Sequence, residues 1–104
     1  MRIRPGILAA IGLAGGALVV AAQQVPPLGG IEKVRDNLYL VRGQGGNTAV
    51  FVTGSGVVLV DTKLTGNGQA ILDQARKVTD RPVTAIVNTH VHGDHVGSNS
   101  FFPE

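Results

Sequence analysis

The sequence has 104 residues, no cysteine and a formal net charge of +2, from nine Lys and Arg against seven Asp and Glu. Arg2 and Arg4 stand at the extreme N-terminus, and without them the acidic and basic residues balance. A balanced chain has no electrostatic footprint for nucleic acid or for an anionic membrane surface, and a chain without cysteine has no disulfide and no lipid anchor on cysteine.

The first 22 residues have the pattern of a secretory signal peptide. Two positive charges precede an apolar run from residue 7 to residue 20, and small residues follow it. The run is broken by glycines and is shorter than the roughly 18 to 20 apolar residues of a membrane span. We therefore predict cleavage after about Ala22, no stable membrane anchor afterwards, and a periplasmic or secreted location. Residues 23–30, rich in proline and glycine, are predicted to be a linker.

The rest of the chain, residues 31–104, alternates short apolar runs with turn residues, which predicts strands. The predicted strands are 31–34, 38–41, 48–52, 57–60 and 82–87. The third and fourth are continuous β-branched and apolar runs around a short turn, so they are predicted to form a hairpin that is buried on both faces. The loop Gly43-Gln44-Gly45-Gly46 lacks the spacing of a dinucleotide-binding loop, and is predicted to be a flexible connection.

One helix is predicted over residues 69–78, where Ile71, Ala75 and Val78 recur at helical spacing after a candidate N-cap at Asn67. Strands buried on both faces need more covering material than one helix supplies. The sequence also ends on Phe101-Phe102-Pro103-Glu104, two large apolar residues with no later element predicted to pack against them. We therefore expect an N-terminal fragment of a longer domain.

All three histidines lie within six residues, at His90, His92 and His95, beside Asp94. Side chains two apart on an extended segment point the same way, so His90 and His92 can hold one metal ion. A sharp turn at Gly93 would carry Asp94 and His95 to the far side, where they can hold a second ion. Nitrogen and carboxylate ligands suit zinc and, less specifically, iron, manganese or nickel. Two metals that share a bridging water activate it, so the pattern predicts hydrolysis.

The stretch His90-x-His92-x-Asp94-His95 is similar to the signature of the metallo-β-lactamase fold superfamily, and residues 57–62 resemble its first motif. The resemblance covers about residues 37–99 and implies an α/β (α+β) fold, an αββα sandwich of which this chain covers only the N-terminal half. It also implies two zinc ions per complete site.

By the same resemblance, His90 and His92 would hold the first zinc, and Asp94 and His95 the second. Asp94 would also orient the attacking hydroxide, and Asp61 would support the loop as a hydrogen-bond acceptor behind the ligands. Ser98 departs from the family pattern, which often has a second glycine there. The family's later ligands, two histidines and an aspartate, do not occur after His95.

The sequence thus predicts a secreted zinc-dependent hydrolase whose substrate is a small-molecule lactam, ester, lactone or thioester, with these 104 residues alone expected to be inactive. Two alternatives stay open. An iron-dependent enzyme similar to the persulfide dioxygenases shares the ligand signature, and the chain could instead be a non-catalytic or incomplete metal-binding protein.

Overall fold

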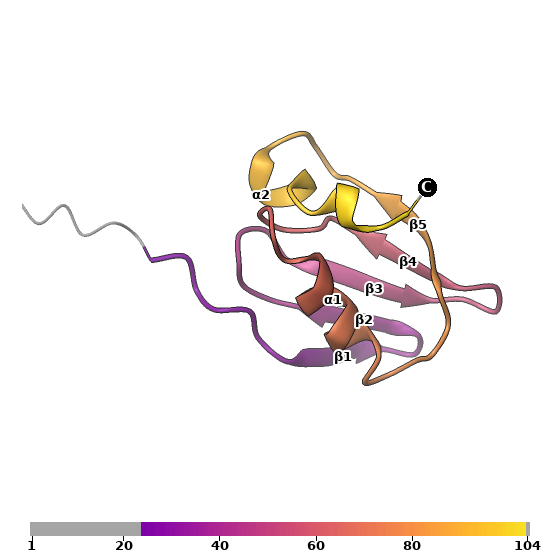
Figure 1. Ribbon diagram of the computed structural model, residues 1–104. Helices are drawn as coiled ribbons and strands as arrows, with labels where there is room; N and C mark the ends of the chain where they lie inside the picture. Colours follow the sequence, from indigo (N-terminus) through magenta and orange to yellow (C-terminus); the bar gives the residue numbers. More distant parts are fainter. Residues whose placement is uncertain (1–23, 104) are drawn as a thin grey trace, which may run out of the picture.

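The computed structural model describes residues 24–103, which form one mixed sheet covered by a helix (Figure 1). The strands are β1 (Ile31–Arg35), β2 (Leu38–Val41), β3 (Thr48–Val52), β4 (Val57–Val60) and β5 (Val83–Val87), and they lie side by side in that order. The helices are α1 (Gly68–Ala75), α2 (Gly93–Val96) and the 3-10 helix η1 (Asn99–Phe101). No helix in this part of the chain is long and apolar enough to cross a membrane. The predicted signal peptide, residues 1–22, lies outside the described residues.

The first four strands form an antiparallel meander, and β5 pairs with β4 in parallel. The predicted hairpin of residues 48–52 and 57–60 is confirmed, since Val52 lies opposite Val57 and Ala49 opposite Val60. A parallel partner requires a crossover connection, which α1 provides between β4 and β5. The predicted α/β (α+β) class is therefore confirmed for the described residues.

The core lies between α1 and one face of the sheet. Six of its side chains are fully buried: Val41, Val50, Val57, Leu59, Ile71 and Ala75. The helix contributes Ile71 and Ala75, which are four residues apart and so lie on one helical face. The side chain of Gln74 also accepts a hydrogen bond from the backbone N–H of Ile31 at 3.0 Å, which ties α1 to the start of β1.

The prediction that the hairpin is buried on both faces is wrong for the described residues. Val50, Val57 and Leu59 are 0% exposed, but Phe51 on the opposite face is 44% exposed. Alternate side chains of a strand point to opposite faces, and α1 covers only one of them (Figure 1). An apolar run cannot reveal from its composition alone which of its faces is covered.

The predicted helix over 69–78 is shorter in the structure, because α1 ends at Ala75. The chain continues in tight turns, in which Lys77 N–H donates to Gln74 O at 3.1 Å. The guanidinium of Arg76 donates to Arg81 O at 2.7 Å and so stabilises the departing chain. Asn67 occupies the N-cap position, as predicted, but its side chain makes no capping bond.

The two phenylalanines near the C-terminus do find packing partners. Phe102 is 8% exposed and belongs to the core, whereas Phe101 is 44% exposed. Their rings meet edge to face with centroids 5.1 Å apart. The expectation that these side chains have nothing to pack against is therefore wrong for Phe102.

Candidate metal centre

The two parallel strands end at the same edge of the sheet, and the segments that follow them lie side by side (Figure 1). The backbone N–H of Asp61, directly after β4, donates to Val87 O at 2.8 Å, and the N–H of Thr62 donates to His95 O at 2.8 Å. The carboxyl ends of parallel strands are the usual place for a ligand site in open α/β sheets. The histidine loop, residues 88–99, is thus fixed against the end of β4.

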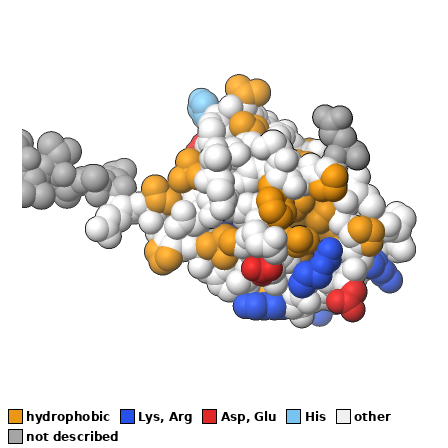
Figure 2. All heavy atoms as spheres, viewed as in Figure 1, with side chains coloured by type: hydrophobic (Ala, Val, Ile, Leu, Met, Phe, Trp, Pro, Cys, Tyr) orange, Lys and Arg blue, Asp and Glu red, His pale blue; other side chains and the backbone are white. Residues whose placement is uncertain are grey.

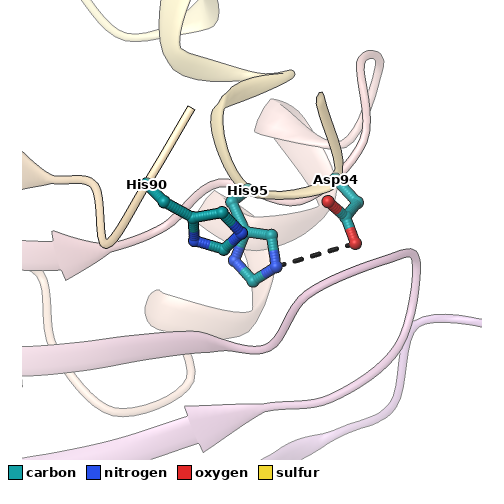
Figure 3. A group of neighbouring side chains, drawn as sticks. All are labelled: His90, Asp94 and His95. Atoms are coloured by element: carbon teal, nitrogen blue, oxygen red, sulfur yellow. Dashed lines mark ion pairs between the residues drawn. The ribbon is translucent and has the colours of Figure 1, made fainter. Parts of the chain in front are cut away.

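His90, Asp94 and His95 converge in this loop (Figure 3). One potential ligand atom from each lies within 4.8 Å of the others. The Nε2 atom of His95 is 3.6 Å from a carboxylate oxygen of Asp94, and the ring centroids of His90 and His95 are 4.1 Å apart. On the face shown in Figure 2, a histidine stands at the opposite end from the Lys and Arg side chains.

Asp61 lies behind these side chains and is only 5% exposed. Its Oδ2 accepts from Nδ1 of His95 at 2.7 Å and from the hydroxyl of Thr89 at 2.8 Å, while Oδ1 accepts from the backbone N–H of Thr89 at 2.8 Å. Burial raises the pKa of the Asp61 carboxyl, but the hydrogen bonds from His95 and Thr89 outweigh burial and bring this pKa below its ordinary value. Asp61 is therefore held as a carboxylate at neutral pH.

The hydrogen bonds of Asp61 assign the tautomers of two histidines. A carboxylate only accepts, so His95 donates through Nδ1–H and keeps the Nε2 lone pair free when neutral. The single hydroxyl proton of Thr89 goes to Asp61, so its oxygen accepts from Nδ1 of His90 at 2.8 Å. Both imidazoles then offer Nε2 as the free ligand atom, which is how carboxylate-backed histidines bind metals.

His92 lies beside this group but outside it. Its ring meets the ring of His90 edge to face with centroids 4.7 Å apart, and its side chain is exposed. The predicted division into a His90 and His92 pair and an Asp94 and His95 pair stays a prediction. In the structure the ring of His90 lies next to the rings of both His92 and His95.

The turn after His92 does not depend on glycine, contrary to the prediction. The extended backbone of His92, with φ −63° and ψ 144°, leads directly into α2, which begins at Gly93. Gly93 has no left-handed φ, and a Cβ there would meet nothing within 4 Å. The start of α2 itself turns Asp94 and His95 toward His90.

Glycines matter instead in residues 43–46, which the sequence predicted to be a flexible connection. The N–H of Gly46 donates to Asp94 O at 2.8 Å, and a Cβ on Gly46 would overlap the imidazole of His95. Gly45, at φ 97°, also lies close to Asp94, since a Cβ on Gly45 would lie 2.8 Å from the Cβ of Asp94. This glycine loop, residues 43–46, therefore packs against two candidate ligands. The run of three glycines in four residues was the signal for such a close approach.

Polar side chains brace the histidine loop from the other side. Asn88 and Asn99 exchange side-chain hydrogen bonds of 3.2 and 2.7 Å, and Thr62 donates to Asn99 at 2.7 Å. Ser98, where the family pattern often has glycine, is 2% exposed and donates to Leu64 O at 2.6 Å. Its hydroxyl also accepts from Asn67 N–H at 2.9 Å, so this serine joins the loop to the start of α1.

The predicted linker, residues 23–30, is described from residue 24 onward and contacts the glycine loop. Gln44 donates to Pro26 O through its backbone at 2.9 Å, and Gly29 N–H donates to Arg42 O at 2.8 Å. Its role as a linker stays a prediction.

The donor set fits a metal ion. Two imidazole nitrogens and a carboxylate oxygen, with no sulfur, form a set that zinc, iron or manganese accepts. The free Nε2 atoms and the anionic Asp61 behind the histidines are the features that such a site requires.

Comparison with known proteins agrees with this geometry. Residues 41–104 match the family model of the metallo-beta-lactamase superfamily. A metal-dependent hydrolase of Pyrococcus abyssi is 42% identical over 52 residues, and one of Pyrococcus horikoshii is 44% identical over 52 residues; each match covers 50% of this chain and 22% of the relative. A linear primary-alkylsulfatase of a Pseudomonas species is 39% identical over 51 residues, which cover 47% of this chain and 10% of that protein. The chain thus matches about a fifth or less of the length of these relatives.

Proposed function

The chain belongs to the metallo-beta-lactamase superfamily, whose model matches residues 41–104, and from this premise we propose that it is part of a secreted, zinc-dependent hydrolase of a small-molecule substrate. The substrate is a lactam, ester, lactone or thioester. The observation that carries the proposal is the convergence of His90, Asp94 and His95 in front of the buried carboxylate of Asp61.

The residues divide into those that would hold zinc and those that hold the ligands in place. His90 and His95 would bind through Nε2 and Asp94 through its carboxylate. His92 is the fourth candidate ligand, and with it the group could hold two ions. Zinc in such a site lowers the pKa of a bound water and polarises the carbonyl that is attacked. Asp61 and Thr89 fix both imidazole tautomers, so little reorganisation is needed on binding.

The relatives support hydrolysis as the reaction class. Two are named metal-dependent hydrolases, and the third is named a linear primary-alkylsulfatase, which makes sulfate esters a further substrate to assay. The balanced charge beyond Arg4 supports a small-molecule substrate over nucleic acid.

The test is metal analysis and turnover by the intact gene product. We expect bound zinc, hydrolysis of at least one ester, thioester, lactone, lactam or alkyl sulfate, and a loss of more than about 100-fold in Asp94→Asn, beyond the range for residues that only support a ligand. Asp73→Asn is the matched control, because Asp73 is exposed on α1 and bonds only Gln69 among the described residues. Iron with oxygen uptake, or metal without any turnover, would contradict the proposal.

The secreted location has a separate test. Met1-Arg2-Ile3-Arg4 and the apolar run after it support export. N-terminal sequencing of the protein recovered from the periplasm or medium should begin near Gln23. A cytoplasmic product that keeps Met1 would contradict this part of the proposal.

A further inference from the structure

Lys63 is a fully buried lysine two residues beyond the carboxylate that supports the histidines. Asp61 and Lys63 both have left-handed backbone, with φ 63° and 66°, which is costly for residues with a Cβ. The segment between them is fixed on both sides, because Thr62 N–H donates to His95 O and Leu64 N–H donates to Gln44 O, at 2.8 and 3.0 Å. It lies between the histidine loop and the glycine loop.

The ammonium group of Lys63 links the end of β2 to the last residue of the glycine loop. Its Nζ donates to Val41 O at 2.6 Å and to Gly46 O at 3.0 Å. Val41 is the last residue of β2, so one contact is anchored in the sheet. The other holds Gly46, the residue whose N–H donates to Asp94 O and whose backbone lies against the imidazole of His95.

Stability alone does not account for a charge at this position. No ion pair among the described residues includes Lys63, and its partners are two neutral carbonyls. Burial lowers the pKa of Lys63 to about 8, so the charged form is disfavoured relative to water. An apolar side chain of similar volume would be buried at lower cost. What the ammonium adds is a link from the end of β2 to the backbone of Gly46.

We propose that Lys63 is a positioning residue of the metal centre: its ammonium holds Gly46, and through Gly46 it holds Asp94 and His95 in the arrangement that binds the ion. This inference rests on the proposed function, because it assumes that these residues bind a metal. It assigns a role to a lysine that neither the histidine signature nor the β4 motif contains.

The test compares Lys63→Met with Ile71→Val in the intact gene product. Ile71 is also fully buried, but it lies on α1 and packs in the hydrophobic core. Zinc affinity is measured by competition with a chromophoric chelator, and cobalt(II) is added as a spectroscopic probe. Both measurements are made under conditions in which each variant is folded. We expect about tenfold weaker zinc binding and an altered cobalt spectrum in Lys63→Met, as for residues that support ligands. Ile71→Val should stay within about twofold of the wild type, and Lys63→Arg should recover part of the loss.

Wild-type affinity and spectrum in Lys63→Met would overturn the inference, and so would an equal loss in Ile71→Val. If Lys63→Met does not fold, Lys63→Gln decides, because its shorter neutral side chain cannot bridge both carbonyls, and wild-type affinity in that variant overturns the inference as well. A wild-type protein that binds neither zinc nor cobalt overturns the proposed function itself. That failure is seen before any variant is made, so the two failures are distinguishable.

Discussion

Asp61 and Lys63 are both buried and only two residues apart, yet their surroundings treat charge in opposite ways. Asp61 faces the histidine loop, where three hydrogen bonds from His95 and Thr89 favour its charged form. Lys63 faces the glycine loop, where two carbonyls are its partners and burial disfavours its charged form. The pKa of each group is lowered, but for an acid this favours the ion and for a base it disfavours it.

The difference shows which side of this segment is optimised for stability. On the Asp61 side, charge and hydrogen-bond donors are matched, so the same contacts stabilise the fold and orient the ligands. On the Lys63 side, a buried ammonium costs free energy that neutral carbonyls only partly offset. Variants on the two sides should therefore change stability in different directions, and each prediction below tests one part of that contrast.

The largest effect is expected from Asp61→Asn. Asparagine keeps the shape but loses the charge that holds Nδ1–H of His95 and the hydroxyl of Thr89. We expect zinc affinity to fall by about 10 to 100-fold and unfolding free energy to fall by about 1.5 to 3 kcal/mol. Chelator competition and urea denaturation at pH 7 measure the two quantities.

The acid dependence gives an independent check on Asp61. Its pKa in the folded protein lies below the unfolded value of about 3.9, so its stabilisation is complete above that value and is lost as the pH falls through the lower, folded pKa. Asp61→Asn should lack this component of acid destabilisation.

Thr89→Val, which disturbs His90 but leaves the Asp61 to His95 bond, should weaken zinc binding less than Asp61→Asn does, by about three to tenfold. Equal losses in both variants would show that Asp61 is not the common support of the two histidines.

The next prediction concerns alkaline pH and Lys63. Its pKa is about 8 in the folded protein and about 10.4 in an unfolded chain, so between these values the unfolded state binds more protons. Stability should therefore rise with pH, by about 2 kcal/mol from pH 8 to pH 10, and then level off. The measurement is the difference in unfolding free energy between wild type and Lys63→Met at several pH values.

Lys33→Met is the control for that experiment, because Lys33 is an exposed residue of β1 paired with Asp36. Its difference from the wild type should change little over the same pH range. A constant difference for Lys63→Met would mean that the folded protein does not disfavour the ammonium, and the contrast with Asp61 would fail.

The sequence predicted the sheet and the cluster of candidate ligands because both depend on residues that are close together in the sequence. Apolar runs bounded by turn residues located all five strands to within a residue or so, and the candidate ligands lie within six residues. The helix was predicted too long because the helical spacing of apolar residues continues to Val78, whereas α1 ends at Ala75 and the chain goes on in tight turns. The exposed face of Phe51 was also missed, because composition does not show what covers a face.

The supporting residues of the site were harder to predict, because their partners are distant in the sequence. Lys63 bonds carbonyls 17 and 22 residues earlier, and nothing in its immediate neighbours distinguishes it from a solvated lysine. The prediction of a flexible glycine loop is wrong for the same reason, since its contacts with Asp94 and His95 span about half the chain. Asp61 was identified through its motif, and in the structure its Oδ2 accepts a hydrogen bond from Nδ1 of His95, while its role in supporting metal ligands stays a prediction.

The smallest effect is expected from Thr48→Val. This variant tests the other buried polar group beside Lys63 that lacks a matched partner. Thr48 lies opposite Val41 in the β2 and β3 pairing, next to the carbonyl that Lys63 binds, and its buried hydroxyl has no hydrogen-bond partner among the described residues. Valine has nearly the same shape without that unsatisfied group, so unfolding free energy should rise by about 1 kcal/mol. Thr53→Val is the control: its hydroxyl donates to Gly56 O at 2.8 Å, so the same substitution should cost about 1 kcal/mol. Urea denaturation of both variants measures the sign directly, and a loss of stability in Thr48→Val would show that the hydroxyl of Thr48 is satisfied.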